Sequence, residues 1–269
     1  MRTMNERVQI ISRLYENGRE DTRLTRSRRG QLEFLTTMDY IHRLCPQPAK
    51  VLEIGAGTGA YSVALAREGY GVTAVELVDG NLRILRERGQ GLSNLASVQG
   101  DALDLGRWAD SAFDLVLCLG PMYHLFDRKD MEQALDEAIR VTRPGGVLMA
   151  AFLSVHAILF DNYLQAEPDS FRAGLAENFT PAYETRHFAA QGFTGFQVKE
   201  FEALLEDRPV EHLATVATDG ILELAKGRSD FVLSDEDFAA YAAYHLRFCE
   251  ERELLGSSSH LLYVGRKKV

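Results

Sequence analysis

Glycine and carboxylate side chains gather near position 55, where they could bind a nucleotide-like ligand that carries positive charge. Gly55, Gly57 and Gly59 follow a short apolar run and precede a helix-like segment. Glycine lets the backbone turn sharply, and the free N–H groups at a helix start can face a ligand. Glu53, two residues before the first glycine, would repel a pyrophosphate but suits an ammonium or sulfonium group. S-adenosylmethionine is a ligand of this kind.

The spacing of these glycines separates two kinds of nucleotide site. Dinucleotide-binding loops have the pattern G-x-G-x-x-G, whereas the third glycine here comes one position early. Together with Glu53, this spacing disfavours a nicotinamide dinucleotide, which stays an alternative ligand.

Acidic residues also end the next two strand-like runs. Glu76 ends the apolar run 71–75, about 20 residues after the first glycine, where a carboxylate can accept two hydrogen bonds from ribose hydroxyls. Asp101 follows the run 96–99. In open α/β sheets, ligands bind outside the carboxyl ends of the strands. We therefore expect both residues to share one cleft with Glu53, and with Leu119 after the fourth run.

Five ordered segments resemble the motifs of the class I S-adenosylmethionine-dependent methyltransferases of the small-molecule type. They are 51–60, which has the first-motif form E/D-x-G-x-G-x-G, and then 71–76, 96–102, 113–118 and 141–148. The resemblance implies S-adenosylmethionine as cofactor and S-adenosylhomocysteine as its product, with Asp101 accepting from the adenine amino group. The residues expected to bind the cofactor are Tyr15, Glu53, Gly55, Ala56, Gly57, Thr58, Gly59, Glu76, Leu77, Gly100, Asp101, Ala102 and Leu119.

The loop after the fourth strand-like run, 119–126, supplies the candidates for the reacting zone. In the family that the chain resembles, this loop borders the transferring methyl group, so Tyr123 and His124 are the predicted catalytic residues. If the acceptor is a hydroxyl or a protonated amine, a base is needed, and His124 is the first choice, with Tyr123 as its alternative. A histidine in such a loop can also be a structural hydrogen-bonding group, and that interpretation stays open.

The same loop argues against nucleic acid as a substrate. Amino-methyltransferases that act on adenine carry Asn/Asp-Pro-Pro-aromatic here, whereas this chain has Gly120, Pro121, Met122 and Tyr123. A formal net charge of −9 also argues against a broad phosphate-binding face. We therefore expect a small-molecule methyl acceptor as the partner.

Strand-like and helix-like segments alternate from residue 50 to 154, which is typical of βαβ units and a parallel sheet. The expected fold is α/β, a Rossmann-like doubly wound and mostly parallel seven-stranded sheet with an N-terminal helical segment and an inserted cap. We expect four parts along the chain. They are a helical cover over 1–46, the cofactor-binding core over 47–154, the cap over 155–195, and completion of the sheet over 196–269 with a helical insertion at about 219–259.

The N-terminal part has two predicted helices, one near residues 5–17 and one that ends before Pro46, with Leu35 among its inward residues. The first helix could simply cover the sheet, or Tyr15 could close over the cofactor as part of a lid. The arginines between the helices are interpreted as a solvated linker. Alternatively, one of them grips the methionine carboxylate or an acidic substrate. They are Arg19, Arg23, Arg26, Arg28 and Arg29.

Composition limits the remaining possibilities. The chain has 269 residues, 46% of them hydrophobic, which is enough for one large domain with a cap. Its three cysteines lack C-x-x-C pairing, so neither a disulfide framework nor a metal site is expected. The first residues have no apolar segment typical of a signal peptide, and the longest apolar run is too short to span a bilayer. These features predict a cytoplasmic protein without a membrane partner, and they leave the oligomeric state open.

Three functions are compatible with these features. The leading one is methyl transfer to an oxygen or nitrogen atom of a small molecule. The others are a non-catalytic protein that binds S-adenosylmethionine and a nicotinamide-dependent oxidoreductase. All five motifs concern the donor, so the acceptor is not specified.

Overall fold

The computed structural model describes residues 4–15, 19–165, 168–188, 192–225, 228 and 230–269. These residues form an eight-stranded sheet whose main path has the order β3-β2-β1-β4-β5-β8-β7, while β6 pairs with β5. The strands are β1 (Lys50–Ile54), β2 (Gly71–Glu76), β3 (Leu95–Gln99), β4 (Phe113–Cys118), β5 (Thr142–Ser154), β6 (Gly195–Phe196), β7 (Val210–Ala217) and β8 (His260–Lys267).

Strand direction agrees with the βαβ pattern of the sequence. The pairs among β1 to β5 are parallel, and β8 runs antiparallel to both β5 and β7. The predicted α/β class with a mostly parallel sheet is confirmed. The seven predicted strands form the main path, and the two-residue β6 is an addition that lies just before the helix beginning at Val198.

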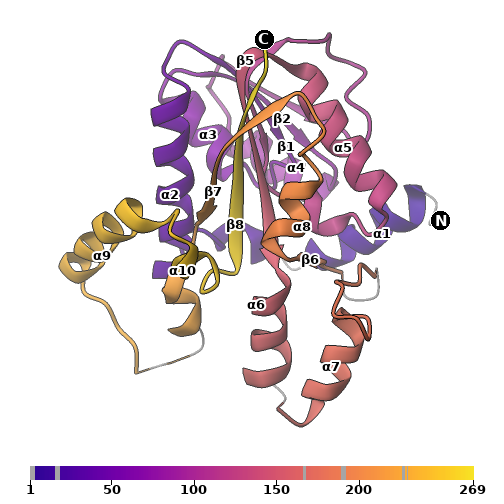
Figure 1. Ribbon diagram of the computed structural model, residues 1–269. Coiled ribbons are helices and arrows are strands. Elements are labelled where there is room, and N and C mark those ends of the chain that lie inside the picture. Colours follow the sequence, from indigo (N-terminus) through magenta and orange to yellow (C-terminus); the bar gives the residue numbers. More distant parts are fainter. Residues whose placement is uncertain (1–3, 16–18, 166–167, 189–191, 226–227, 229) are drawn as a thin grey trace.

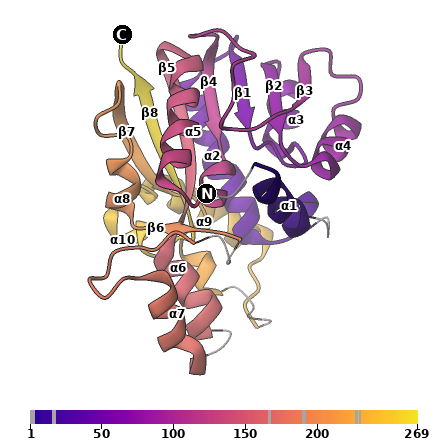
Figure 2. The ribbon, with the colours of Figure 1, turned by 90° about the vertical axis from the view of Figure 1, so that its right-hand side faces the viewer.

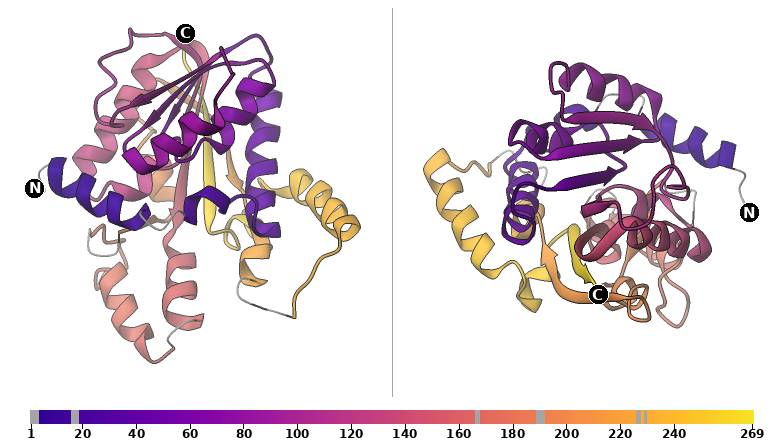
Figure 3. Two further views of the ribbon diagram at one scale, coloured as in Figure 1. Left: turned by 180° about the vertical axis from the view of Figure 1, so that it is seen from behind. Right: turned by 90° about the horizontal axis from the view of Figure 1, so that it is seen from above.

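Helices cover both faces of the sheet, as Figure 3 shows from behind and from above. One face carries α2 and α3, and the other carries α5 and α8. The helices are α1 (Met4–Tyr15), α2 (Arg28–Leu44), α3 (Ala60–Arg67), α4 (Asp79–Arg88), α5 (Arg128–Val141), α6 (Val155–Leu159), α7 (Phe171–Asn178), α8 (Val198–Ala203), α9 (Asp235–Phe248) and α10 (Arg252–Leu255).

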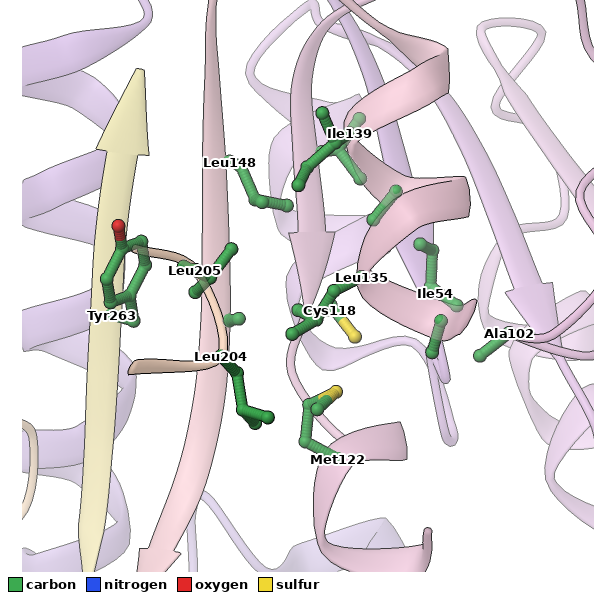
Figure 4. Packing of buried hydrophobic residues seen from close by; sticks show 14 of the residues in the cluster. Ile54, Ala102, Cys118, Met122, Leu135, Ile139, Leu148, Leu204, Leu205 and Tyr263 are labelled. Atoms are coloured by element: carbon green, nitrogen blue, oxygen red, sulfur yellow. The ribbon is translucent and has the colours of Figure 1, made fainter. Parts of the chain in front are cut away.

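Alternation along the strands divides the buried side chains between two clusters. In β4, Cys118 points toward α5, whereas Leu117 points toward α2, because successive strand residues face opposite sides. Figure 4 shows the first cluster, in which Leu135 of α5 packs over the sheet. The rings of Phe152 and Phe201 stack at 4.1 Å between their centres. This packing holds the carboxyl ends of the strands in fixed positions.

The structure adds detail to the predicted helices. The helical insertion expected at about 219–259 includes α9, which ends at Phe248, and α10, which follows it separately. Leu35 was expected to face inward, but it is 41% exposed because it lies on the outer side of α2. The predicted end of the first helix, near residue 17, lies outside the described residues.

The segment after β5 projects beyond the carboxyl edge of the sheet as α6 and α7 (Figures 1 and 2). Its place is that of the predicted cap, although the division of the chain into four parts stays a prediction. The three cysteines are free and buried. Over the described ranges, no helix combines the length and apolar character that crossing a membrane would need.

Candidate active site

One pocket opens at the carboxyl ends of β1, β2 and β4. Nearly all the residues that were predicted from the sequence to form the site line this pocket. Part of its wall comes from the N-terminal segment, and Figure 2 shows α1 near these strand ends. The wall residues from this segment are Arg7, Ile11, Tyr15, Glu20, Arg23 and Leu24. Gly59 does not line the pocket; it caps α3 with a φ of +86° instead. The predicted residues that do line it are Tyr15, Glu53, Gly55, Ala56, Gly57, Thr58, Glu76, Leu77, Gly100, Asp101, Ala102, Leu119, Tyr123 and His124.

The glycine loop leaves bare backbone facing this pocket. Gly55 has a φ of +73°, and a Cβ atom there would come within 2.7 Å of the Pro121 ring. Gly57 has a φ of +56°, and its N–H donates to Oε2 of Glu76 at 2.7 Å. In a phosphate-binding loop, such an N–H group would be free to donate to the ligand, whereas the Gly57 N–H already donates to a carboxylate of the protein.

Two buried carboxylates flank the loop. Glu53 is 2% exposed and accepts a hydrogen bond from the Ser62 hydroxyl. Burial raises the pKa of Glu53 to about 7, against the opposing effect of Ser62. Glu76 accepts from the Val78 N–H at 2.7 Å through its other oxygen, and burial raises its pKa to about 6. Both groups are poised to bind a cation or hydroxyl donors at neutral pH.

Asp101 is buried and paired with Arg7 of α1 in an ion pair across the pocket. The Leu103 N–H also donates to its Oδ1 at 3.1 Å. The residue predicted to accept from an adenine amino group therefore has a guanidinium partner in this structure. The sequence offered no signal for that partner, since the two residues lie 94 positions apart.

His124 connects α1 to the loop after β4. Its Nδ1 lies 2.9 Å from the Gly192 carbonyl oxygen, which can only accept, so Nδ1 carries the proton. Its Nε2 then accepts from the Tyr15 hydroxyl at 2.7 Å. Burial is the main cause that lowers the pKa of His124 to about 4. Both ring nitrogens are occupied, which favours the structural interpretation of this histidine over its predicted role as a base.

Tyr123, the other predicted catalytic residue, is also engaged. Its hydroxyl donates to the Leu119 carbonyl oxygen at 2.6 Å, and burial raises its pKa above the usual value. A neutral phenol that donates to a backbone carbonyl is a weak base. The catalytic assignment of both residues stays a prediction.

The interpretation of the arginines as a solvated linker is wrong for Arg23 and Arg29. Arg23 lines the pocket, where its Nε donates to Glu20 at 3.0 Å and its Nη1 to Glu33 at 2.6 Å. Arg29 pairs with the buried Glu223. The guanidinium of Arg23 thus already binds two carboxylates of the chain, a long-range pairing that charge patterning cannot reveal. Arg23 was among the alternative candidates for binding a carboxylate, and that role stays a prediction. The pocket residues that sequence patterns did not indicate are Arg7, Ile11, Glu20, Leu24, Ala60, Tyr61, Asn81, Gly120 and Pro121.

Comparison with known proteins identifies the segment that supplies most of this pocket. A family model described as a methyltransferase domain matches residues 51–146, which include the glycine loop, Glu76 and Asp101. Residues 51–146 are a class I methyltransferase domain. S-adenosylmethionine is the cofactor of this domain family.

Named relatives of the methyltransferase domain differ in what they act on. The demethylmenaquinone methyltransferase of Clavibacter sepedonicus is 31% identical over 140 residues, which cover 50% of this chain and 55% of that protein. The glycine/sarcosine N-methyltransferase of Parasynechococcus marenigrum is 34% identical over 118 residues, 41% of each chain. The chain thus spans about half, or less, of the length of these curated relatives.

The fold is shared over nearly the whole chain with a solved methyltransferase structure. The crystal structure of a SAM-dependent methyltransferase from Thermotoga maritima, described as a possible histamine N-methyltransferase, superposes with a TM-score of 0.60. The match covers 97% of this chain and 100% of that one at 19% identity. At this identity the likeness concerns the fold, including its N-terminal and C-terminal parts.

The raised pKa of Glu53 predicts that cofactor binding depends on pH. An ammonium group beside Glu53 binds the ionised carboxylate, which is scarce below a pKa of about 7. We expect the affinity for S-adenosylhomocysteine to rise up to tenfold per pH unit below pH 7 and to level off above it. Calorimetric titrations from pH 5.5 to 8.5 test this. A Glu53→Gln variant should bind weakly and keep only the dependence below about pH 6 that Glu76 contributes, so an unchanged slope between pH 6 and 7 in that variant would contradict the assignment.

The Arg7 ion pair predicts a second effect on binding. Because Arg7 occupies Asp101, the adenine amino group has to displace it, and a charged hydrogen bond is worth about 1.5–3 kcal/mol before compensation. We expect Arg7→Gln to raise the affinity for S-adenosylhomocysteine about threefold to tenfold. Arg13→Gln, on an exposed position of α1, is the matched control. Weaker binding in Arg7→Gln would mean that Arg7 assists the bound cofactor instead.

Proposed function

We propose that this chain transfers a methyl group from S-adenosylmethionine to an oxygen or nitrogen atom of a small molecule. One observation carries the proposal. Three buried carboxylates, Glu53, Glu76 and Asp101, lie at the ends of successive strands and face one pocket beside a bare glycine loop. This donor set suits an amino group, ribose hydroxyls and an adenine amino group, and it requires no phosphate.

Each group of pocket residues would bind a different part of the cofactor. Glu53 would hold the ammonium group of the methionine part, and Gly55 and Gly57 would let that part lie against the backbone. The two carboxylate oxygens of Glu76 accept from the N–H groups of Gly57 and Val78, and the carboxylate would also accept from ribose hydroxyls. Asp101 would accept from adenine once Arg7 has moved. When bound, S-adenosylmethionine supplies an electrophilic methyl group on a sulfonium centre.

The protein's main contribution to such a reaction is alignment and exclusion of water. Tyr15 and His124 join α1 to the loop after β4, so α1 would close the pocket over its ligand. Holding two reactants in line can be equivalent to an effective concentration of roughly 10⁵ M or more. A wall of Leu119, Pro121 and Tyr123 would keep the region of transfer dry.

The electrostatics of the loop disfavour a nicotinamide dinucleotide. Glu53 and Glu76 both lie at the glycine loop, and the Gly57 amide already donates to Glu76. A pyrophosphate would therefore meet two carboxylates and lose an amide donor. The non-catalytic alternative differs only in the absence of transfer, so it requires a direct assay.

Two measurements on the purified protein test the proposal. Calorimetric titration with S-adenosylhomocysteine and with NAD determines which nucleotide binds. Incubation with methyl-tritiated S-adenosylmethionine then tests transfer to glycine, sarcosine and histamine as amines and to phenol and a hydroxynaphthoquinone as hydroxyl acceptors. Tight binding without transfer to any acceptor favours the non-catalytic alternative, and binding of NAD alone overturns the proposal.

A further inference from the structure

The carboxyl edge of the sheet continues beyond the cofactor pocket to the first residue of β8, His260. Along β8, Leu262 and Val264 pack toward α2, so the alternation of side chains places His260 on that same face. Its ring lies perpendicular to the ring of Tyr123 with 6.4 Å between their centres, and Tyr123 lines the pocket. His260 therefore stands beside the pocket on the side of β5 and β8, past the strands that carry Glu53 and Leu119.

A completely buried carboxylate orients this histidine. Asp219, just after β7, has its Oδ2 3.0 Å from His260 Nδ1. The same carboxylate accepts from the Ser259 N–H at 2.9 Å, the Ser259 hydroxyl at 2.6 Å and the His260 N–H at 3.2 Å. The Ser258 hydroxyl also donates to it. This many donors fix the carboxylate, and an imidazole held through Nδ1 presents Nε2 to a partner.

The charges around His260 come from three elements. Glu33 of α2 lies 3.9 Å from its Nδ1, and Arg23 of the segment before α2 pairs with that glutamate. Arg29 of α2 lies 3.5 Å from Asp219. Burial by itself would lower the pKa of His260, but the carboxylates of Glu33 and Asp219 raise it overall. The carboxylates of Glu33 and Asp219 thus stabilise the imidazolium form of His260 after the ring has accepted a proton.

The two histidines beside Tyr123 differ in what their nitrogens do. His124 uses both of its nitrogens within the protein. For His260, every hydrogen bond in the described part of the chain involves Nδ1 or the backbone, and none involves Nε2. Its side chain is 16% exposed, so the ring is not sealed off. Of the two, only His260 combines a ring nitrogen that makes no hydrogen bond within the described part of the chain with a carboxylate that supports its charge.

We propose that His260, oriented by Asp219, accepts through Nε2 the proton that the methyl acceptor releases. The inference rests on the proposed methyl transfer. In this step the oxygen or nitrogen of the acceptor forms a bond to the methyl carbon, and the carbon–sulfur bond breaks with its electron pair going to sulfur. The proton of the acceptor goes to Nε2. His260 is then a catalytic residue, and Asp219 is a positioning residue.

A bound metal ion is the other chemistry that this cluster suggests. One donor atom each from Glu33, Asp219 and His260 lie within 4.8 Å of one another. Two guanidinium groups already face these carboxylates, however, since Arg23 pairs with Glu33 and Arg29 approaches Asp219. A divalent cation would be repelled by both arginines, so the charge pattern favours the proton-accepting role.

The first arm of the test needs no acceptor. Imidazole titrations by NMR, with ¹⁵N-histidine protein saturated with S-adenosylhomocysteine, give the pKa of His260, which is assigned with His260→Gln. We expect a value above the usual 6.5 that falls by about one unit or more in Asp219→Asn. A value below 6.5, or one that Asp219→Asn leaves unchanged, would overturn the proposal.

The second arm measures turnover with the acceptor from the panel that the wild type methylates fastest. We expect His260→Gln to lower kcat about 100-fold or more, because a general base contributes about 10²–10⁴. Its affinity for S-adenosylhomocysteine should stay within twofold. In Asp219→Asn, the acidic limb of the pH–kcat profile should move to lower pH. His212→Gln, on the far end of β7, is the matched control.

The outcomes of the two arms separate this proposal from the proposed function. A His260→Gln variant that keeps kcat within threefold of wild type overturns the role of His260 while methyl transfer stands. A wild type that fails to bind S-adenosylhomocysteine instead counts against the proposed function itself. Loss of cofactor affinity in His260→Gln alongside loss of kcat would assign the residue a structural role and overturn the proposal.

Discussion

Replacing Glu76 with alanine is expected to weaken the binding of S-adenosylhomocysteine at least 100-fold. The carboxylate is the predicted acceptor for two ribose hydroxyls, and hydrogen bonds to charged groups are worth about 1.5–3 kcal/mol each. The same substitution removes the acceptor from the N–H groups of Gly57 and Val78, both at 2.7 Å, so the glycine loop loses its anchor. A loss of about 2.8 kcal/mol corresponds to a 100-fold change in affinity. Isothermal titration measures it directly.

Two further variants serve as controls for the effect of Glu76→Ala on affinity. Glu76→Gln keeps the size of the side chain and one carbonyl oxygen, so its affinity should fall between those of wild type and Glu76→Ala. Glu87→Ala, at an exposed position of α4, should bind as wild type does. Thermal unfolding confirms that each variant is folded. Affinity within fivefold of wild type in Glu76→Ala would mean that the ribose lies elsewhere in the pocket.

The sequence was most informative where function depends on neighbours in the chain. The glycine loop, with Glu53 just before it, is a local pattern, and Glu76 and Asp101 follow apolar runs whose strand character is also local. Parallel strands then bring these ends to one edge of a sheet, a general property of the fold. Twelve of the thirteen predicted cofactor residues therefore line one pocket, and Gly59 differs because its φ of +86° serves the start of α3.

Pairings between distant charged groups could not be predicted in the same way. Arg7 and Asp101 are separated by 94 positions, and Asp219 and His260 by 41. Composition and periodicity describe which groups are charged but not which of them meet after folding. Arg23 illustrates the consequence, since its place in a charged segment suggested solvent, whereas it lies at the pocket between Glu20 and Glu33.

The role of His124 also depended on a distant partner. Its position in the loop after β4 made it the natural candidate for a base, but the Gly192 carbonyl and the Tyr15 hydroxyl occupy its two nitrogens. Tyr15 was predicted as a possible lid residue from its own segment, and the bond between them links both predictions. The chemistry expected of His124 fits the surroundings of His260 better.

Substitution of Asp219 by alanine should cause a large loss of stability. Asp219 is completely buried and accepts from the Ser258 and Ser259 hydroxyls and from two backbone N–H groups. Alanine leaves these donors unsatisfied, and it removes the carboxylate that bonds His260 and lies 3.5 Å from Arg29. Removing one member of a buried charge network costs about 3–5 kcal/mol. We expect the free energy of unfolding, measured by urea denaturation followed by circular dichroism, to fall by about that amount.

Matched variants separate burial from charge in this result. Asp219→Asn keeps one carbonyl oxygen for the backbone donors, so it should lose less stability than Asp219→Ala and remain folded for the titration of His260. Asp230→Ala removes an exposed aspartate that pairs with Arg228, two positions away, and its unfolding midpoint should match that of wild type. If Asp219→Ala unfolded at the same urea concentration as Asp230→Ala, the network around Asp219 would not stabilise the fold. The carboxylate would then have to be retained for its effect on His260 alone.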